Sequence, residues 1–535
     1  MFMFNIGIMR KYIHIALLSV LVALTSCDLN EKSADSIPFS EAFKSIETIE
    51  SLERGAYSRL RTQYSLSSII APDIQADYVN AVNGFSNTYG SIYQWTFAYN
   101  DQDVTSTWNT MYGTISQCNF ILDGIAKNLA FTPTEEERLT LEQIQGRLYL
   151  IRAMSYSLLA ERFCQDYEAE TAGDSYTGLP LALTHDTSLK LDRSTLQKTY
   201  ETILDDLSKA RTLLAGSGSG SPNSTTLNLD CVTAVEAHVY LQMDDWPNAL
   251  AKAKTLINNT AYSLVESKEE LREMWEYDTS DEIIFKFYAS TTEIAYQWGY
   301  YFFFDYFSGT GEFFQIYPDY IPTQTCVDAF EDEDWRKSVY LTDCSMNGDF
   351  TFKSDYTLFI KGLSMYARNG YVISKYPGNP DLRTSNQSNY YNTFKPIRLA
   401  EMYLIAAEAA VQSGATGEDA ASNWLNPLRE HRGLAALETV TLADVQEERY
   451  REMMLEGTRL TDLKRWKLPM DRGECQSGYV GPDDYGAWTN GSYVSDLGTD
   501  LVKESGDYMF VWPIPADEIF ASPQFAAQQN PGWSR

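Results

Sequence analysis

This sequence predicts a mainly α-helical fold that carries long irregular loops and a few short strands. Apolar residues at helical spacing recur through most of the chain from residue 39 onward. The neighbouring segments 231–243 and 246–258 have the pattern of a helix hairpin. The segment 283–391 differs, because it is rich in Tyr, Phe, Gly and Asn and poor in helical spacing. Irregular segments on a rigid scaffold commonly form binding surfaces, so we expect the ligand-binding residues in loops.

The first 26 residues have the features of a lipoprotein signal peptide. The basic pair Arg10–Lys11 precedes an uncharged, largely apolar run over 12–24, which is too short to span a bilayer permanently. The motif Leu24-Thr25-Ser26-Cys27 that follows resembles a bacterial lipobox. We therefore expect cleavage before Cys27, lipid on its thiol, and a flexible tether over 27–37. The alternative is an ordinary signal peptide with an incidental cysteine.

The rest of the chain, 38–535, is expected to form one helical body with an N-terminal part over about 38–320 and a C-terminal part over about 321–535. Short strands are expected at 283–288 and 371–376, where β-branched and aromatic residues cluster. Helical spacing predicts helices over 43–57, 108–122, 141–163, 200–214, 231–243, 246–258, 398–412, 419–431 and 447–466.

The pair 231–243 and 246–258 resembles a tetratricopeptide-type hairpin. Small residues at contact positions, among them Ala237 and Ala249, and a short turn between the two segments carry this resemblance. The helices predicted at 200–214, 398–412 and 419–431 are candidates to stack on the hairpin. Long insertions interrupt the spacing, so we expect embedded hairpins and not a regular solenoid.

Composition excludes some functions. The formal net charge is -31, and no basic stripe is available to displace phosphate counterions, which argues against a nucleic-acid partner. The same charge argues against adsorption to anionic lipid, so any membrane attachment must come from the lipid anchor.

Cysteines and histidines show no catalytic or metal-binding spacing. Six cysteines follow Cys27 without a Cys-x-x-Cys motif, so buried thiols and an occasional disulfide both remain open. His185, His238 and His431 belong to no recognisable catalytic motif. No cofactor is expected; loop carboxylates allow a structural calcium ion, but no EF-hand-like spacing is present.

Several blocks together resemble the SusD/RagB family of Bacteroidetes outer-membrane lipoproteins. They keep the family's order over nearly the whole mature chain. The blocks are Trp108-x-x-x-Tyr112, Arg152-Ala153-x-x-Tyr156, Pro396 to Ala409, Glu448 to Trp466, Pro513-Ile-Pro515 and Gln529 to Trp533.

This resemblance implies a SusD-like helical scaffold with a binding function and no enzymatic activity. It implies that the protein faces the cell exterior at the outer membrane, captures an oligosaccharide and delivers it to a TonB-dependent, SusC-like transporter. A peptide ligand in the same role is one alternative, and a helical-repeat scaffold that binds only proteins is another. A glycoside hydrolase would need two carboxylates facing each other across a cleft, and no catalytic motif indicates one.

Paired carboxylates in the C-terminal blocks have a structural interpretation. Arg398, Glu401 and Glu408 fall on roughly one helical face, as do Glu452, Glu456 and Arg459. Carboxylates so spaced could serve catalysis or hold a metal. Because arginines accompany them on the same faces, we expect buried ion pairs that attach the C-terminal helices to the scaffold.

Two segments supply the residue types that bind sugars, since pyranose faces stack on aromatic rings and polar side chains bond the hydroxyls. In the second segment, 296–317, the rings at 296, 298, 300 and 302 alternate, so an extended chain would place them on one side. The alternative is that these rings are core residues. The candidate ligand residues are Asp77, Tyr78, Asn83 and Trp95 from the first segment, 73–100, and Tyr296, Trp298 and Tyr300 from the second.

Overall fold

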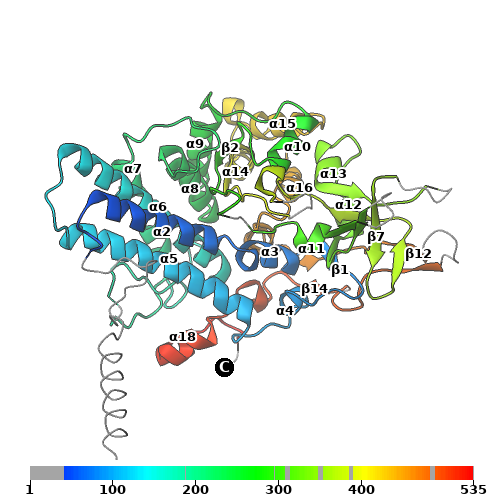
Figure 1. Ribbon diagram of the computed structural model, residues 1–535, viewed down its shortest axis with the longest axis horizontal. Coiled ribbons are helices and arrows are strands. Elements are labelled where there is room, and N and C mark those ends of the chain that lie inside the picture. The colour runs from blue at the N-terminus through cyan, green and yellow to red at the C-terminus, as the bar shows by residue number, and fades with distance from the viewer. Residues whose placement is uncertain are drawn as a thin grey trace, which may run out of the picture.

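The computed structural model describes residues 41–533 except 187, 294–295, 308–313, 348–352, 385–389, 482–488 and 500. The expected signal peptide, Cys27 and the tether lie outside the described residues. A layer of long helices forms one side of the molecule, and short strands gather on the other (Figure 1). None of the helices in the described part of the chain is long and apolar enough to cross a membrane.

The helical layer confirms the mainly α-helical prediction. Its longest member begins with a capping box, in which Thr134 and Glu137 each bond the other's backbone amide. The helices are α2 (Ile46–Gln63), α3 (Leu66–Gln75), α5 (Gln102–Lys127), α6 (Glu135–Phe163), α7 (Leu196–Leu213), α8 (Leu229–Gln242), α9 (Trp246–Ile257), α14 (Leu399–Ser413), α15 (Ser422–Glu430), α16 (Leu442–Glu452) and α17 (Arg459–Arg465).

The predicted hairpin is present as α8 and α9. The side chains of Asn228 and Asp245 cap the two helices, and Ala237 and Ala249 are fully buried where the helices pack. Helix α7 packs on α8, and α14 packs on α9 and on α15. The expected stacking on the hairpin is therefore confirmed for the helices predicted at 200–214 and 398–412, whereas the helix predicted at 419–431 packs on α14.

The segment 447–466, predicted as one helical block, is instead divided between α16 and α17. The chain turns at Gly457, whose φ of +84° lies in the left-handed region. The Gly457 amide donates to the Asp73 carboxylate at 2.8 Å. A Cβ at this position would lie 3.0 Å from Ile69, so glycine also allows α3 to approach closely.

Six short strands form a mixed sheet that is larger than the few isolated strands expected. Its order is β13-β12-β8-β7-β4-β3, with β4 and β7 parallel and every other pair antiparallel. Strands from both sides of residue 320 take part. They are β3 (Asp305–Phe307), β4 (Phe314–Ile316), β7 (Tyr356–Ile360), β8 (Met365–Ala367), β12 (Ser477–Gly481) and β13 (Thr489–Ser492).

Four two-stranded antiparallel pairs, six further α-helices and four short 3-10 helices complete the described elements. The strands expected at 283–288 and 371–376 are present, in shorter form, as β2 and β9. The pairs are β1 (Val79–Ala81) with β5 (Tyr320–Pro322), β2 (Ile283–Phe285) with β10 (Ile397–Arg398), β6 (Leu341–Asp343) with β9 (Tyr371–Ile373), and β11 (Met470–Asp471) with β14 (Val502–Lys503). The helices are α4 (Gly90–Tyr93), α10 (Lys268–Glu276), α11 (Tyr300–Phe303), α12 (Gln324–Asp328), α13 (Trp335–Tyr340) and α18 (Ala516–Ala521).

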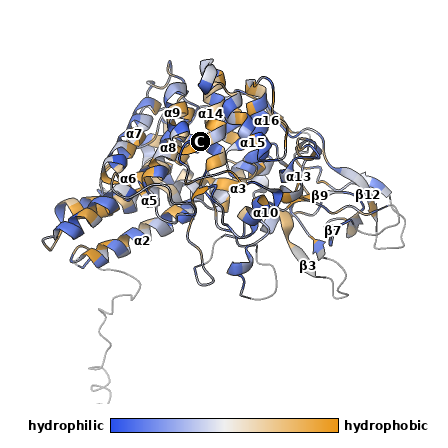
Figure 2. Cartoon of the chain, turned by 90° about the horizontal axis from the view of Figure 1, so that it is seen from above, coloured by the Kyte–Doolittle hydropathy of each residue, from blue (hydrophilic) through white to orange (hydrophobic). Residues whose placement is uncertain are grey.

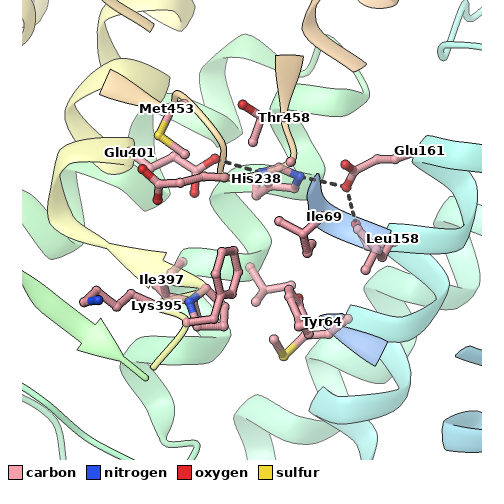
Figure 3. Close-up of a pocket in the computed structure, with 18 of the residues that line it drawn as sticks. Tyr64, Ile69, Leu158, Glu161, His238, Lys395, Ile397, Glu401, Met453 and Thr458 are labelled. Atoms are coloured by element: carbon pink, nitrogen blue, oxygen red, sulfur yellow. Dashed lines mark hydrogen bonds and ion pairs between the residues drawn. The ribbon is translucent and has the colours of Figure 1, made fainter. Parts of the chain in front are cut away.

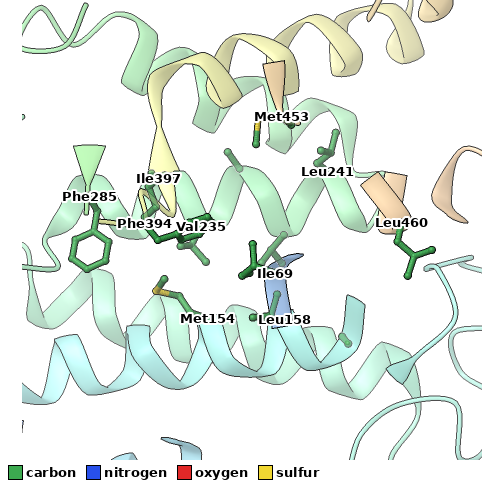
Figure 4. Close-up of a cluster of buried hydrophobic side chains, with 14 of the residues drawn as sticks. Ile69, Met154, Leu158, Val235, Leu241, Phe285, Phe394, Ile397, Met453 and Leu460 are labelled. Atoms are coloured by element: carbon green, nitrogen blue, oxygen red, sulfur yellow. The ribbon is translucent and has the colours of Figure 1, made fainter. Parts of the chain in front are cut away.

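The main apolar core lies within the helical layer, and a smaller one lies against the sheet. The main core includes Ile69 of α3, Leu158 of α6, Val235 of α8 and Ile397 of β10, which converge in Figure 4. Hydrophobic and hydrophilic residues share most helices, as the mixed colouring in Figure 2 shows. Burial of the apolar faces makes the helical layer a rigid support for the loops.

The C-terminal tail lies over the body, as its prolines indicated. Trp512 donates from its backbone amide to the Arg162 carbonyl and from its indole to Gln75, each at 2.8 Å. The Asn530 amide group bonds the carbonyl oxygens of Phe163 and Trp512. These contacts attach the tail to α6 and α3.

Candidate functional site

The C-terminal carboxylates form buried ion pairs, which confirms the structural interpretation of these blocks. Arg398 is 2% exposed and its Nη1 lies 2.9 Å from both Glu282 and Glu452. Its Nε donates to Glu456 at 3.0 Å. Its partners come from the residue just before β2 and from the region of α16, and Glu401 of α14, the helix that Arg398 precedes, is not among them. The prediction from helical faces thus identified the charged residues of the ion pairs but not which residues pair with each other.

His238 connects three helices through two carboxylates. Its Nε2 lies 2.9 Å from Glu161 of α6, and its Nδ1 lies 3.1 Å from Glu401 of α14 (Figure 3). Burial lowers the pKa of His238, but the two carboxylates outweigh it and raise the pKa to about 10. Burial likewise opposes ionisation of Glu401, yet His238 and Arg449 bring its pKa to about 2. The His238 imidazolium of α8 therefore joins α6 and α14 through two ion pairs, and we call this arrangement the His238 clamp.

The space beside His238 is too small for an oligosaccharide. Figure 3 shows Glu161, His238, Glu401 and Thr458 on one side of the cavity, Ile69 next to His238, and Ile397, Lys395 and Tyr64 on the opposite side. The cavity measures about 90 Å³, whereas small-molecule pockets typically measure roughly 300–1,000 Å³. A cavity of this size with polar groups on one side suits a few water molecules. Both imidazole nitrogens are held by carboxylates, so neither is placed to act as a base on a ligand.

The described residues contain neither a cluster arranged to bind a metal ion nor a disulfide. Within them, no group of three or more His, Cys, Asp and Glu side chains is arranged to hold a metal ion. The structural calcium ion therefore stays a prediction without a candidate site. Five cysteines are buried free thiols, which settles the thiol-or-disulfide alternative for Cys118, Cys164, Cys231, Cys326 and Cys344.

Asp77 and Tyr78 lie beside α17. The Asp77 carboxylate accepts two hydrogen bonds from Arg459, at 2.9 and 2.7 Å. Tyr78 is buried and donates to the Tyr450 carbonyl at 2.9 Å. Asp77 reaches the edge of an open groove of about 840 Å³, but its charge is already neutralised by Arg459.

Three further candidate ligand residues pack against or hydrogen-bond to other parts of the protein. Trp298 is 1% exposed and stacks on Phe394 with 4.7 Å between ring centroids. Trp95 is buried, packs edge-on against Phe510 and donates from its indole to the Gln75 carbonyl at 2.8 Å. Asn83 is half-buried and its backbone amide donates to the Tyr493 carbonyl. Neither tryptophan presents a ring face to solvent in this arrangement.

The expected alternation of rings over 296–302 is wrong, because the chain forms the short helix α11 from Tyr300. Trp298 and Phe302 therefore turn into the core, while Tyr296 is half-buried and Tyr300 is 39% exposed. Of the aromatic candidates predicted from the sequence, Tyr296 and Tyr300 are the two that reach the surface. A helix turn, not a strand, sets their directions.

These two rings belong to a tyrosine strip, which we define as Tyr89, Tyr288, Tyr296, Tyr300 and Tyr301. Tyr301 meets Tyr89 and Tyr300 edge-on, with centroids 5.7 and 5.3 Å apart. Burial, with the neighbouring hydroxyls of Tyr301 and Tyr296, raises the pKa of Tyr89. Tyr296 and Tyr288 line one hollow beside the C-terminal end of α2. Tyr89 itself is buried, so the strip meets solvent mainly through Tyr288 and Tyr300, with Tyr296 and Tyr301 half-buried.

The strip ends at an open groove along α2, called the α2 groove below. The groove measures about 450 Å³, within the range of ligand pockets, and Tyr288 at its rim is 55% exposed. Arg61 positions this rim, since its guanidinium donates to the Tyr288 carbonyl at 3.1 Å and pairs with Glu293 at 2.7 Å. The lining residues are Glu53, Arg54, Tyr57, Ser58, Arg61, Arg147, Thr225, Thr226, Phe287, Tyr288 and Glu293.

Sequence reasoning missed most residues of the α2 groove. Tyr288 ends the predicted strand 283–288, and its place just beyond a buried strand was the one available signal. Arg61 lies 227 positions away in the chain, so its contact with Tyr288 depends on the tertiary fold. Helical spacing identifies the outer face of α2 as solvated but does not show which loop lies beside it.

Comparison with known proteins identifies the family. The family model described as "SusD family" matches residues 287–533, and the model described as "Starch-binding associating with outer membrane" matches residues 29–241. SusD-like protein P2 of Formosa agariphila is 23% identical over 490 residues, which cover 86% of this chain and 91% of that protein.

Solved structures share the fold. A SusD superfamily protein from Bacteroides thetaiotaomicron superposes with a TM-score of 0.71 at 22% identity, over 91% of this chain and all (100%) of that one. Surface glycan-binding protein A from Bacteroides uniformis gives a TM-score of 0.66 at 19% identity, over 91% of this chain and 99% of its own. The two family matches follow each other along the sequence and together with the full-length relative show that this chain belongs to the SusD/RagB family.

Proposed function

We propose that this protein is a cell-surface lipoprotein that captures oligosaccharides in the α2 groove and along the tyrosine strip. The exposed ring of Tyr288 at the rim of the groove carries the proposal. Sugar rings stack on aromatic faces through their C–H groups, and the guanidinium and carboxylate groups of Arg61 and Glu293 suit the hydroxyls. The name of the Bacteroides uniformis protein of the same fold, a surface glycan-binding protein, supports this ligand class.

The groove suits binding without hydrolysis. Its two carboxylates, Glu53 and Glu293, each form an ion pair with an arginine. A glycosidase needs one protonated and one ionised carboxyl group facing the scissile bond. Both carboxylates of this groove are engaged by arginines, so they are not available as such a pair. The protein is proposed to pass its ligand on unchanged, to a TonB-dependent, SusC-like transporter.

Attachment to the outer membrane by lipid on Cys27 belongs to the same proposal. The lipobox-like motif supports it, as does the description of the family model that begins at residue 29, which places that family at the outer membrane. Mass spectrometry of the mature N-terminus tests the anchor. Diacylglycerol and an acyl chain on Cys27 are expected, and an unmodified cysteine would contradict it.

The central experiment is calorimetric titration of the purified protein with a panel of oligosaccharides, followed by the Tyr288→Ala variant. Loss of the ring should weaken binding about tenfold or more, which corresponds to about 1.4 kcal/mol. Tyr277→Ala is the matched control, since Tyr277 is another exposed tyrosine that lies outside the groove. Wild-type affinity in Tyr288→Ala would refute the proposed site. Release of reducing ends from any bound glycan would refute binding without hydrolysis.

A further inference from the structure

The α2 groove has a positive excess within a strongly acidic protein. The whole chain carries a formal charge of -31. The groove, in contrast, is lined by three arginines, Arg54, Arg61 and Arg147, and by two glutamates, Glu53 and Glu293. Its lining is therefore enriched in cations relative to the molecule as a whole.

One of these arginines is left without a carboxylate. Arg147 forms a bidentate pair with Glu53, and Arg61 pairs with Glu293. Arg54 is exposed on the same side of α2 and donates to the Ser51 hydroxyl. Among the described residues, no carboxylate forms an ion pair with Arg54. Its positive charge therefore remains available to a ligand.

Two other open grooves in the described part of the chain have the opposite balance. Acidic residues outnumber basic ones in both, so the cationic lining of the α2 groove does not follow from composition. The groove of about 840 Å³ is lined by Asp77, Asp328, Glu331, Glu447, Asp471 and Glu474 against Arg451 and Arg459. The groove of about 520 Å³ is lined by Asp123, Glu201, Asp205 and Asp206 against Arg152, Lys198 and Lys209.

We propose that the α2 groove selects anionic oligosaccharides, which carry carboxylate or sulfate groups, over neutral ones. This inference rests on the proposed glycan binding at the same groove. The planar guanidinium of Arg54 can donate two parallel hydrogen bonds to a carboxylate or a sulfate, which a hydroxyl cannot match in charge. Tyr288 would stack the sugar ring whose acidic group Arg54 binds.

The acidic remainder of the protein does not prevent such a ligand from binding. At physiological ionic strength the Debye length is about 8 Å, so exposed charges beyond this distance are largely screened. The nearest charges then dominate the potential inside the groove, and these include the unpaired Arg54. Competition by salt should consequently weaken binding of a charged sugar and leave a neutral one nearly unaffected.

The test compares oligosaccharides of matched length and linkage by calorimetric titration of the mature protein: neutral, carboxylated and sulfated. The carboxylated or the sulfated oligosaccharide should bind about tenfold tighter than the neutral one. Raising the NaCl concentration from about 50 to about 500 mM should lower the affinity for the charged oligosaccharide and leave that for the neutral one nearly unchanged. Arg54→Gln should weaken binding of the charged oligosaccharide about tenfold and that of the neutral one much less, so that the preference for the charged sugar is lost. Arg59→Gln is the matched control, an exposed arginine of α2 outside the groove lining.

The outcomes separate this inference from the proposed function. If neutral sugars bind as tightly as charged ones, or if Arg54→Gln has no effect, the charge selection is wrong, while binding that depends on Tyr288 preserves the proposed function. If no glycan binds, or if an acidic peptide binds in preference to every glycan, both fail. Arg54 is exposed, so circular dichroism should show an unchanged fold in Arg54→Gln, and any loss of affinity then reports on the groove.

Discussion

Replacing Arg398 by methionine tests whether the buried ion pairs hold the C-terminal helices to the scaffold. Arg398 lies among three buried carboxylates, with Nη1 at 2.9 Å from Glu282 and from Glu452 and Nε at 3.0 Å from Glu456. Methionine has a similar length and no polar atoms that need partners. The variant therefore removes the charge and hydrogen bonds while largely preserving the volume.

The expected destabilisation follows from the partners that remain. Arg432 still contacts Glu282 and Glu452, each at 2.9 Å, and Lys375 still contacts Glu456 at 2.7 Å. Removing one partner of a buried pair generally costs about 3–5 kcal/mol, because it leaves an uncompensated buried charge. The remaining cations place the expected loss at the low end of that range, about 3 kcal/mol.

Urea unfolding followed by far-UV circular dichroism measures this loss. Lys209→Met is the control, because Lys209 and Asp205 form an exposed pair on α7 that should contribute less than about 1 kcal/mol. The double variant Arg398→Met/Glu282→Gln should lose less stability than the sum of the losses in the two single variants. Without Arg398 the Glu282 charge is poorly compensated, and Glu282→Gln removes that charge. If Arg398→Met were no less stable than Lys209→Met, the structural role assigned to the network would be wrong.

Two further predictions concern the interior. Because Glu161 and Glu401 raise the pKa of His238 from 6.5 to about 10 against the effect of burial, its stabilising contribution is fully present below pH 6.5 and is lost as the pH rises toward 10. Thermal melts across this range should show a smaller fall in Tm for His238→Gln than for the wild type, and equal falls would contradict the His238 clamp. Trp298→Ala should lose about 3–5 kcal/mol of stability, since it deletes a buried ring stacked on Phe394. A wild-type Tm combined with lost glycan binding in this variant would show instead that the ring serves the ligand.

The helices were predictable from the sequence because their signal is local. Period-3.6 spacing located α6, α8, α9 and α14 to within a few residues at most of their ends. The division between α16 and α17 was not visible, because the turn at Gly457 depends on a hydrogen bond to Asp73, which lies 384 positions away. The six-stranded sheet was also missed, since its strands are three to five residues long and its local strand pairs are joined by pairings between distant segments, β4 with β7 and β8 with β12.

The proposed binding surface could be predicted as a type of residue, aromatic side chains in loops, but not as particular residues. The expectation that tyrosine-rich loops form it led to Tyr296 and Tyr300, which do reach the surface, and equally to Trp298, which does not. An aromatic side chain has the same local pattern whether it stacks on Phe394 in the core or lies at a groove rim, as Tyr288 does. Only the position of α2 against the segment after β2 distinguishes the two cases.

Net charge gives an incomplete picture of this protein for a related reason. Arg398, Arg432 and Arg336 are buried among carboxylates, so these cations are neutralised inside the fold and contribute little to the surface. Arg54 counts equally in the formal sum of -31 but remains unpaired at an open groove. A ligand meets the local charge of its groove and not the total, because salt screens exposed charges beyond about 8 Å. The acidic composition that argues against a nucleic-acid partner is therefore compatible with a groove that selects acidic sugars.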